Sequence, residues 1–141
     1  MANNTHLHDS YNLKPGSQDN ITLTVTIGFA QLGATTINLD GSSVCNTATD
    51  QQGNSIQPGA KCVYPKSFSL IVGQNDSLAG KQLVIISNVE RIFDDGQAGA
   101  DQSSVDISLS GGQQDKVYPT LSGTISSKGD FLTYIAVISL Q

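Results

Sequence analysis

Apolar side chains recur at every second position over residues 21–29, and this spacing limits the fold more than any other feature of the chain. The apolar positions are Ile21, Leu23, Val25, Ile27 and Phe29, with threonine at most positions between them. Successive side chains of a β-strand point to opposite faces, so the pattern predicts a strand with one buried face. The β-branched residues on both sides of the alternation favour the same structure.

Further strands are predicted along the rest of the chain, over residues 34–39, 63–72, 83–92, 105–110, 117–125 and 131–140. Glycine, asparagine and aspartate separate them, and no segment has helical periodicity over three turns. We therefore expect an all-β fold, an antiparallel two-sheet β-sandwich of jelly-roll or immunoglobulin-like type with about seven or eight strands. The segment from Leu83 to Ile92 is more continuously apolar than the segment 21–29, which predicts a central strand buried on both faces. Pro65 predicts an edge position or a bulge in its segment.

The chain of 141 residues and 14.8 kDa has the length of one domain. Residues 20–141 are expected to form this sandwich domain. Residues 1–19 are polar and without apolar periodicity, which predicts an irregular N-terminal arm. The long polar segment 41–59 predicts a connection that is functional or mobile.

The charge of the chain argues against several partners. Twelve acidic and seven basic side chains give a net charge of −5, and the basic ones are scattered singly. Nucleic-acid binding needs a basic surface, so we expect no nucleic-acid partner. No apolar run is long enough for a membrane helix, so no integral membrane segment is expected. The segment MANNTHLHDSYN lacks the features of a signal peptide, which predicts a cytoplasmic protein, export by a signal-independent route, or a chain that begins after processing.

Two cysteines, Cys45 and Cys62, are the only ones in the chain. A disulfide between them would stabilise the fold by about 3 kcal/mol if the geometry allowed it. Without a signal peptide, however, the interpretation we favour is two reduced thiols, at least one of them partly buried.

Residues suited to catalysis are scarce. The two histidines, His6 and His8, lie in the expected arm, where a fixed catalytic geometry is hard to maintain, and the chain has no nucleophile elbow or phosphate-binding loop. We therefore predict that the protein is not an enzyme. Without tryptophan, only Tyr64 and Tyr118 could offer a stacking platform for sugars, and we expect both to pack structurally at strand edges instead.

Acidic residues in the predicted end loops suggest a cation site. If segment 63–72 is one strand, the connections 40–59, 93–102 and 126–130 share one end of the sandwich. That end would gather Asp40, Asp94, Asp95 and Asp101, whose carboxylates are ligands that calcium prefers. The arrangement is similar in outline to calcium-dependent lipid-binding sandwich domains. The alternative is that these residues only form soluble turns.

Assembly is the other use that the sequence suggests. The rows Thr22-Thr24-Thr26 and Thr35-Thr36 lack the lysines that usually protect exposed strand edges, and the arm 1–19 could pair with a neighbour's edge. We therefore expect a non-catalytic binding or assembly module, acting through strand edges or end loops on a protein partner or on itself. It could be a structural component of a larger particle. The alternatives are a solvated monomer and a calcium-dependent ligand- or membrane-binding domain. We expect no required cofactor, with calcium as the one candidate.

Overall fold

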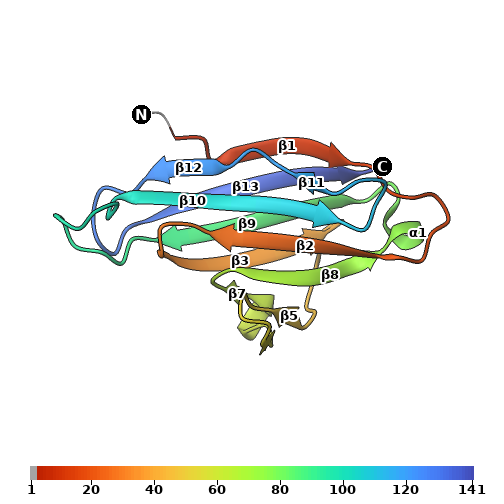
Figure 1. Ribbon diagram of the computed structural model, residues 1–141, viewed down its shortest axis with the longest axis horizontal. Helices are drawn as coiled ribbons and strands as arrows, with labels where there is room; N and C mark the ends of the chain where they lie inside the picture. The colour runs from red at the N-terminus through yellow and green to blue at the C-terminus, as the bar shows by residue number, and fades with distance from the viewer. Residues whose placement is uncertain (1–2) are drawn as a thin grey trace.

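Two β-sheets packed face to face make up the structure (Figure 1). The computed structural model describes residues 3–141, so Met1 and Ala2 of the expected arm lie outside the described residues. Strands predominate, and nearly all of their pairings are antiparallel. The prediction of an all-β, two-sheet antiparallel sandwich is confirmed. No helix in the described part of the chain is long and apolar enough to cross a membrane.

One sheet, which we call the β9 sheet, has the strand order β1-β13-β9-β3-β4, and β7 also pairs with β3. Its strands are β1 (His6–Tyr11), β3 (Leu32–Leu39), β4 (Ser42–Ser43), β7 (Tyr64–Pro65), β9 (Gln82–Glu90) and β13 (Phe131–Leu140). β1 pairs with β13 in parallel, whereas the other pairs are antiparallel. As predicted, the apolar run from Leu83 forms a central strand of its sheet.

The second sheet, the β2 sheet, has the order β11-β10-β2-β8-β5-β6, and β12 also pairs with β10. Its strands are β2 (Asn20–Ile27), β5 (Ala48–Thr49), β6 (Ser55–Ile56), β8 (Phe68–Gln74), β10 (Gln102–Ser110), β11 (Lys116–Val117) and β12 (Leu121–Thr124). The helical elements are a short 3-10 helix, η1 (Ala60–Cys62), and one α-helical turn, α1 (Asn75–Leu78). β2 lies between β10 and β8, so its threonine row is not at an open edge. β3 is likewise paired on both sides.

The sandwich has two ends, which we name by their loops. The tip carries the connections 28–31, 91–101 and 125–130, because β2 and β9 end there and β3, β10 and β13 begin there. The base carries the connections 12–19, 75–81 and 111–115. In Figure 1 the tip is at the left and α1 marks the base at the right.

Alternating side chains from both sheets form the core between them. Tyr64 and Phe68 stack there with ring centroids 4.9 Å apart, and Tyr134 lies 2.5 Å, hydroxyl to hydroxyl, from Ser103. Tyr64 and Tyr118 are 0% and 2% exposed. Their predicted packing role is confirmed, because a ring buried to this extent offers no platform to a sugar.

The prediction of an irregular arm over residues 1–19 was wrong for β1. His6–Tyr11 forms an edge strand of the β9 sheet, and Tyr11 and Leu13 are 2% and 3% exposed. The Asp9 carboxylate also contacts the Lys116 ammonium at 3.0 Å. The sequence did not predict this strand because only Leu7 and Tyr11 are apolar within it, too few to show an alternation of apolar and polar residues.

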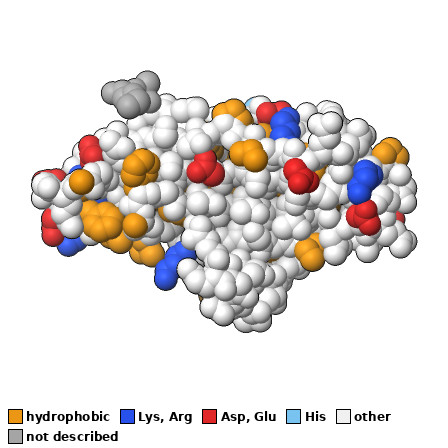
Figure 2. Space-filling view, viewed as in Figure 1, with side chains coloured by type: hydrophobic (Ala, Val, Ile, Leu, Met, Phe, Trp, Pro, Cys, Tyr) orange, Lys and Arg blue, Asp and Glu red, His pale blue; other side chains and the backbone are white. Residues whose placement is uncertain are grey.

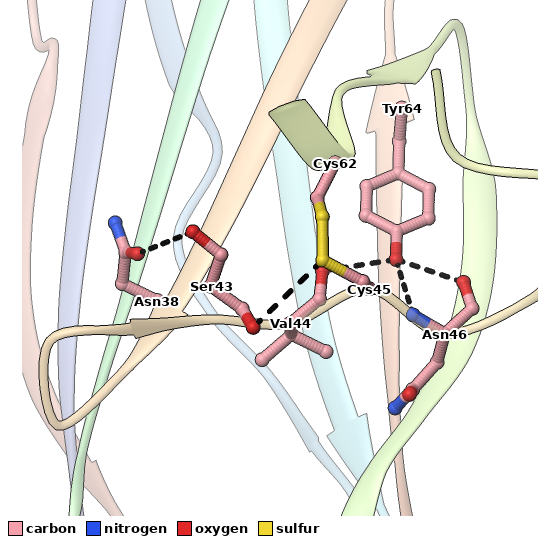
Figure 3. The surroundings of a disulfide bond; sticks show 7 residues. All are labelled: Asn38, Ser43, Val44, Cys45, Asn46, Cys62 and Tyr64. Atoms are coloured by element: carbon pink, nitrogen blue, oxygen red, sulfur yellow. Dashed lines mark hydrogen bonds between the residues drawn. A yellow bond between two sulfur atoms is a disulfide. The ribbon is translucent and has the colours of Figure 1, made fainter. Parts of the chain in front are cut away.

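The prediction of two reduced thiols was also wrong, because Cys45 and Cys62 form a disulfide with Cα atoms 5.1 Å apart (Figure 3). The bond closes the excursion that leaves β4 and returns through η1 to β7. Beside it, the Tyr64 hydroxyl lies 3.0 Å from the Val44 carbonyl and accepts a hydrogen bond from the Asn46 amide at 2.8 Å. Instead of one long loop, segment 41–59 therefore contains short strands tied to the sandwich.

Candidate binding surface

Large hydrophobic side chains are exposed together at the tip. Phe29 is 52% exposed, Leu32 44%, Ile92 39% and Phe131 65%. Leu32 and Phe131 flank Glu90 on neighbouring strands, and Leu32 and Ile92 line the same hollow. Figure 2 shows hydrophobic side chains gathered at this end, at the left of the view, with charged groups around them. Contiguous exposed apolar surface of this kind is typical of interaction sites.

The turn that carries Phe29 has an unfavourable backbone for its residues. Phe29 and Ala30 have φ angles of 59° and 54°, in the left-handed region that asparagine and glycine adopt more readily. Each costs about 1 kcal/mol there. The prediction that Phe29 points into the core was wrong: β2 ends at Ile27, and the chain then crosses to the other sheet.

Gln31 holds three parts of the tip together from a buried position, with 5% of its surface exposed. Its side-chain amide donates to the carbonyls of Ala100 at 2.9 Å and Gln102 at 3.0 Å. Its side-chain oxygen accepts a hydrogen bond from the Ile92 amide at 3.0 Å. One side chain thus fixes the Phe29 turn against the loop that presents Ile92.

Arg91 connects the other tip loops from a buried position, with 2% of its surface exposed. Its guanidinium donates to the carbonyls of Phe93 at 2.9 Å, Ile125 at 3.1 Å and Ser126 at 2.8 Å. It also contacts the Asp95 carboxylate at 2.5 Å. A buried charge is tolerated only when it is paired and hydrogen-bonded, so these contacts explain how the arginine can occupy the interior of the tip.

Two hollows adjoin the exposed apolar side chains, one on each side of Leu32. A groove of about 230 Å³ runs between Leu32 and Phe131, with Ala34 and Glu90 in its lining. A larger hollow of about 500 Å³ lies towards Ile92; its apolar lining is Ile27, Ala30, Leu32, Ile56, Pro65 and Ile92. The tip therefore combines protruding side chains with adjacent recesses.

The structure separates the four predicted calcium ligands. Asp94, Asp95 and Asp101 lie at the tip, but Asp40 lies at the base, where its carboxylate accepts a hydrogen bond from the Gln82 amide at 2.8 Å. The prediction that Asp40 joins the others was wrong. Segment 63–72 is two strands, β7 and β8, and the chain reverses between them, so Asp40 and loop 93–101 lie at opposite ends.

The three carboxylates at the tip have different surroundings. Asp94 contacts Lys128 at 3.3 Å, and Asp95 pairs with Arg91. Asp95 and Asp101 line a further hollow of about 460 Å³ that Arg91 also lines. Over residues 3–141, no group of three or more histidine, cysteine, aspartate or glutamate residues is placed to hold a metal ion. Calcium binding by loop 93–101 stays a prediction, which melting curves with about 1 mM calcium or a chelator would test.

Comparisons with known proteins add no family to this description. Searches against protein-family models, curated proteins and solved structures find no match to the chain. Among the exposed tip residues, Phe29 and Ile92 were predicted to lie within strands, but β2 ends at Ile27 and β9 ends at Glu90. The prediction that Phe131 begins a strand is confirmed. One signal for the tip loop was present: after Glu90-Arg91, the apolar pair Ile92-Phe93 directly precedes Asp94-Asp95-Gly96, a turn sequence.

Proposed function

We propose that the protein is a non-catalytic binding module that holds an apolar segment of a protein partner against its tip. The observation that carries the proposal is Phe29, an aromatic side chain half exposed on a left-handed turn. Residues in unfavourable backbone conformations persist where the surroundings hold them, and they cluster at sites of binding and catalysis. A folded chain gains no stability from this arrangement, so a binding role accounts for it best.

The rigidity and composition of the tip support the same proposal. Gln31 and Arg91 fix the loops before a partner arrives, which lowers the entropy lost on binding. Exposed aromatic and aliphatic groups at the centre are surrounded by charged groups such as Lys128 and Asp94, the usual arrangement of a protein interface. The smaller hollow, of about 230 Å³, lies below the ~300–1,000 Å³ typical of small-molecule sites, whereas the larger one, of about 500 Å³, lies within that range. Their positions side by side, one on each side of Leu32, suit successive side chains of a peptide.

The double substitution Phe29→Asn with Ala30→Gly should weaken the binding of a partner while it raises the stability of the fold. It should raise the free energy of unfolding by about 1–2 kcal/mol, because asparagine and glycine tolerate the left-handed turn. The probe is a random peptide library displayed on phage and selected on the unsubstituted protein. We expect apolar peptides whose affinity falls at least tenfold with the double variant.

Val117→Asn is the matched control, since Val117 is 77% exposed but lies away from the tip on β11. The control should bind the selected peptides like the unsubstituted protein. Selection of no peptide, or of peptides that bind the double variant equally well, would contradict the proposal.

We also propose that the protein functions in an oxidising compartment. The Cys45–Cys62 disulfide supports this, because structural disulfides persist in secreted and periplasmic settings and are rare in the reducing cytosol. Mass spectrometry of the protein after thiol alkylation in intact cells tests it. Recovery of two alkylated cysteines would contradict it.

A further inference from the structure

The outer face of the β9 sheet is more apolar than a solvated face requires. Along β9, Leu83, Ile85 and Val89 point into the core, with at most 1% of each exposed. Val84 and Ile86 alternate with them and point outward. The sequence predicted a strand buried on both faces; in the described residues its inner face is buried, whereas Val84 and Ile86 on the outer face are half-buried.

The neighbouring strand continues this apolar surface. Ile135 lies opposite Ile86 and Val137 lies opposite Val84 in the antiparallel pair of β13 and β9. Residues paired in this way on one face have Cβ atoms about 5 Å apart. These four side chains form a compact patch that we call the aliphatic square. It lies on the two central strands of the sheet, between β1 and β3.

The surroundings of the aliphatic square are polar but carry no carboxylate, lysine or arginine. In the same rows lie Thr36 and Asn38 on β3 and His6 and His8 on β1, and the row next to them holds Thr133 and Asn88. Acidic groups lie outside these rows: Asp40 borders the next row towards the base, where it contacts Gln82, and Glu90 lies two rows away towards the tip. An apolar centre within an uncharged polar border is the usual anatomy of an interface.

Charge decides which partner fits this face. The chain has a net charge of −5, so two copies repel each other unless they meet through a surface without acidic groups. The rows around the aliphatic square provide such a surface. A face without charge is also complementary to itself, as a two-fold interface requires, whereas it offers no ion pairs to a partner recognised by charge.

The size of the face is sufficient for a weak dimer. The strands β1, β3, β9 and β13 contain 33 residues together, and at about 4.8 Å between strands and about 3.4 Å per residue their face covers roughly 540 Å². Two copies would therefore bury roughly 1,100 Å², just above the ~1,000 Å² expected of a specific interface. An interface of this size is compatible with dissociation constants in the micromolar range.

We propose that two copies of the chain pair face to face through the outer faces of their β9 sheets. The two-fold axis lies in the plane of the interface and runs perpendicular to the strands through the centre of the aliphatic square, which places Ile86 and Ile135 of one copy against Val84 and Val137 of the second copy. Phe29 and Ile92 lie on loops beyond this face and stay accessible in the dimer, whereas Leu32 and Phe131, at the tip ends of β3 and β13, lie at the rim of the dimer interface. The inference rests on other observations than the proposed function, and the two surfaces meet at Leu32 and Phe131.

The test is the mass of the protein in solution, measured by sedimentation equilibrium from about 1 to 500 μM. The unsubstituted chain should pass from monomer to dimer within this range. Ile86→Lys should remain a monomer throughout, because the substitution puts two ammonium groups into the apolar centre. Ile135→Thr, which is a milder change, should weaken the dimer at least tenfold. Circular dichroism melting confirms that each variant is folded.

Ser108→Lys is the matched control, since Ser108 lies at an outward position on the central strand β10 of the other sheet. It should dimerise like the unsubstituted chain, and so should the Phe29→Asn, Ala30→Gly variant. A monomer at 500 μM for the unsubstituted chain would overturn the proposal. Dimers of unchanged affinity in folded Ile86→Lys, or equal weakening by Ser108→Lys, would also overturn it.

Discussion

Single buried polar side chains determine the shape of the tip, and Gln31 shows how. Its amide group joins loop 28–31 to the loop that follows β9 through three hydrogen bonds. Gln31→Ala should therefore lower the free energy of unfolding by about 2 kcal/mol, because buried backbone groups lose their partners. Denaturant unfolding measures this, with the exposed Gln52→Ala as the control. Equal stability of the two variants would show that the tip does not depend on Gln31.

Residue-scale errors of the sequence analysis have a common physical cause. Phe29 continues the alternation that begins at Ile21, so nothing in the period shows that the strand ends at Ile27. The end is set by tertiary structure: the Gly28 amide donates to the Ser104 carbonyl at 3.0 Å, and the chain crosses between the sheets. Local patterns identified the strand but not the point at which it leaves its sheet.

At the scale of elements, β1 is held to the sandwich partly by charge. The Ser10 amide, 2.7 Å from the Asp9 carboxylate, and the Lys116 ammonium lower the pKa of Asp9. A lowered folded-state pKa contributes stability above the unfolded value of about 3.9, and this contribution is lost as the pH falls through the folded value. The melting temperature of Asp9→Asn should therefore lie below that of the unsubstituted protein at pH 6 and approach it by pH 3. Asp76→Asn, an exposed change at the same end, should show no such convergence.

The disulfide, like the Asp9–Lys116 contact, holds part of the chain to the sandwich, here the short strands between β4 and β7. Cys45 and Cys62 are separated by 17 residues, and closing a loop of about this length stabilises a protein by about 3 kcal/mol. Cys45→Ala with Cys62→Ala should lose roughly that amount in urea unfolding. Dithiothreitol should have the same effect on the unsubstituted protein and none on the variant. A loss below about 0.5 kcal/mol would show that β4 to β7 hold their places without the bond.

At the scale of the whole molecule, the sequence was sufficient for the fold class but not for the site. Period-two segments such as 105–110 predict strands because burial on one face requires the alternation. Which loops share an end depends instead on how often the chain reverses. The unpredicted reversal between β7 and β8, inside segment 63–72, separates Asp40 at the base from the acidic loop at the tip. The tip surface combines side chains from segments about 100 residues apart, Phe29 and Phe131 among them, and only the tertiary structure brings such segments together.

Four tyrosines report on the integrity of the whole sandwich, because they come from both ends of the chain and all are buried. Tyr11, Tyr64, Tyr118 and Tyr134 are at most 2% exposed, and burial raises the pKa of each above the usual value of about 10. A raised folded-state pKa stabilises the fold below pH 10, and this stability is lost as the pH rises through the folded values. Tyrosinate absorbance should therefore appear together with the loss of β-sheet circular dichroism, in one transition above pH 10. Stepwise ionisation near pH 10 with the β-sheet signal unchanged would show that these rings are accessible in the folded protein.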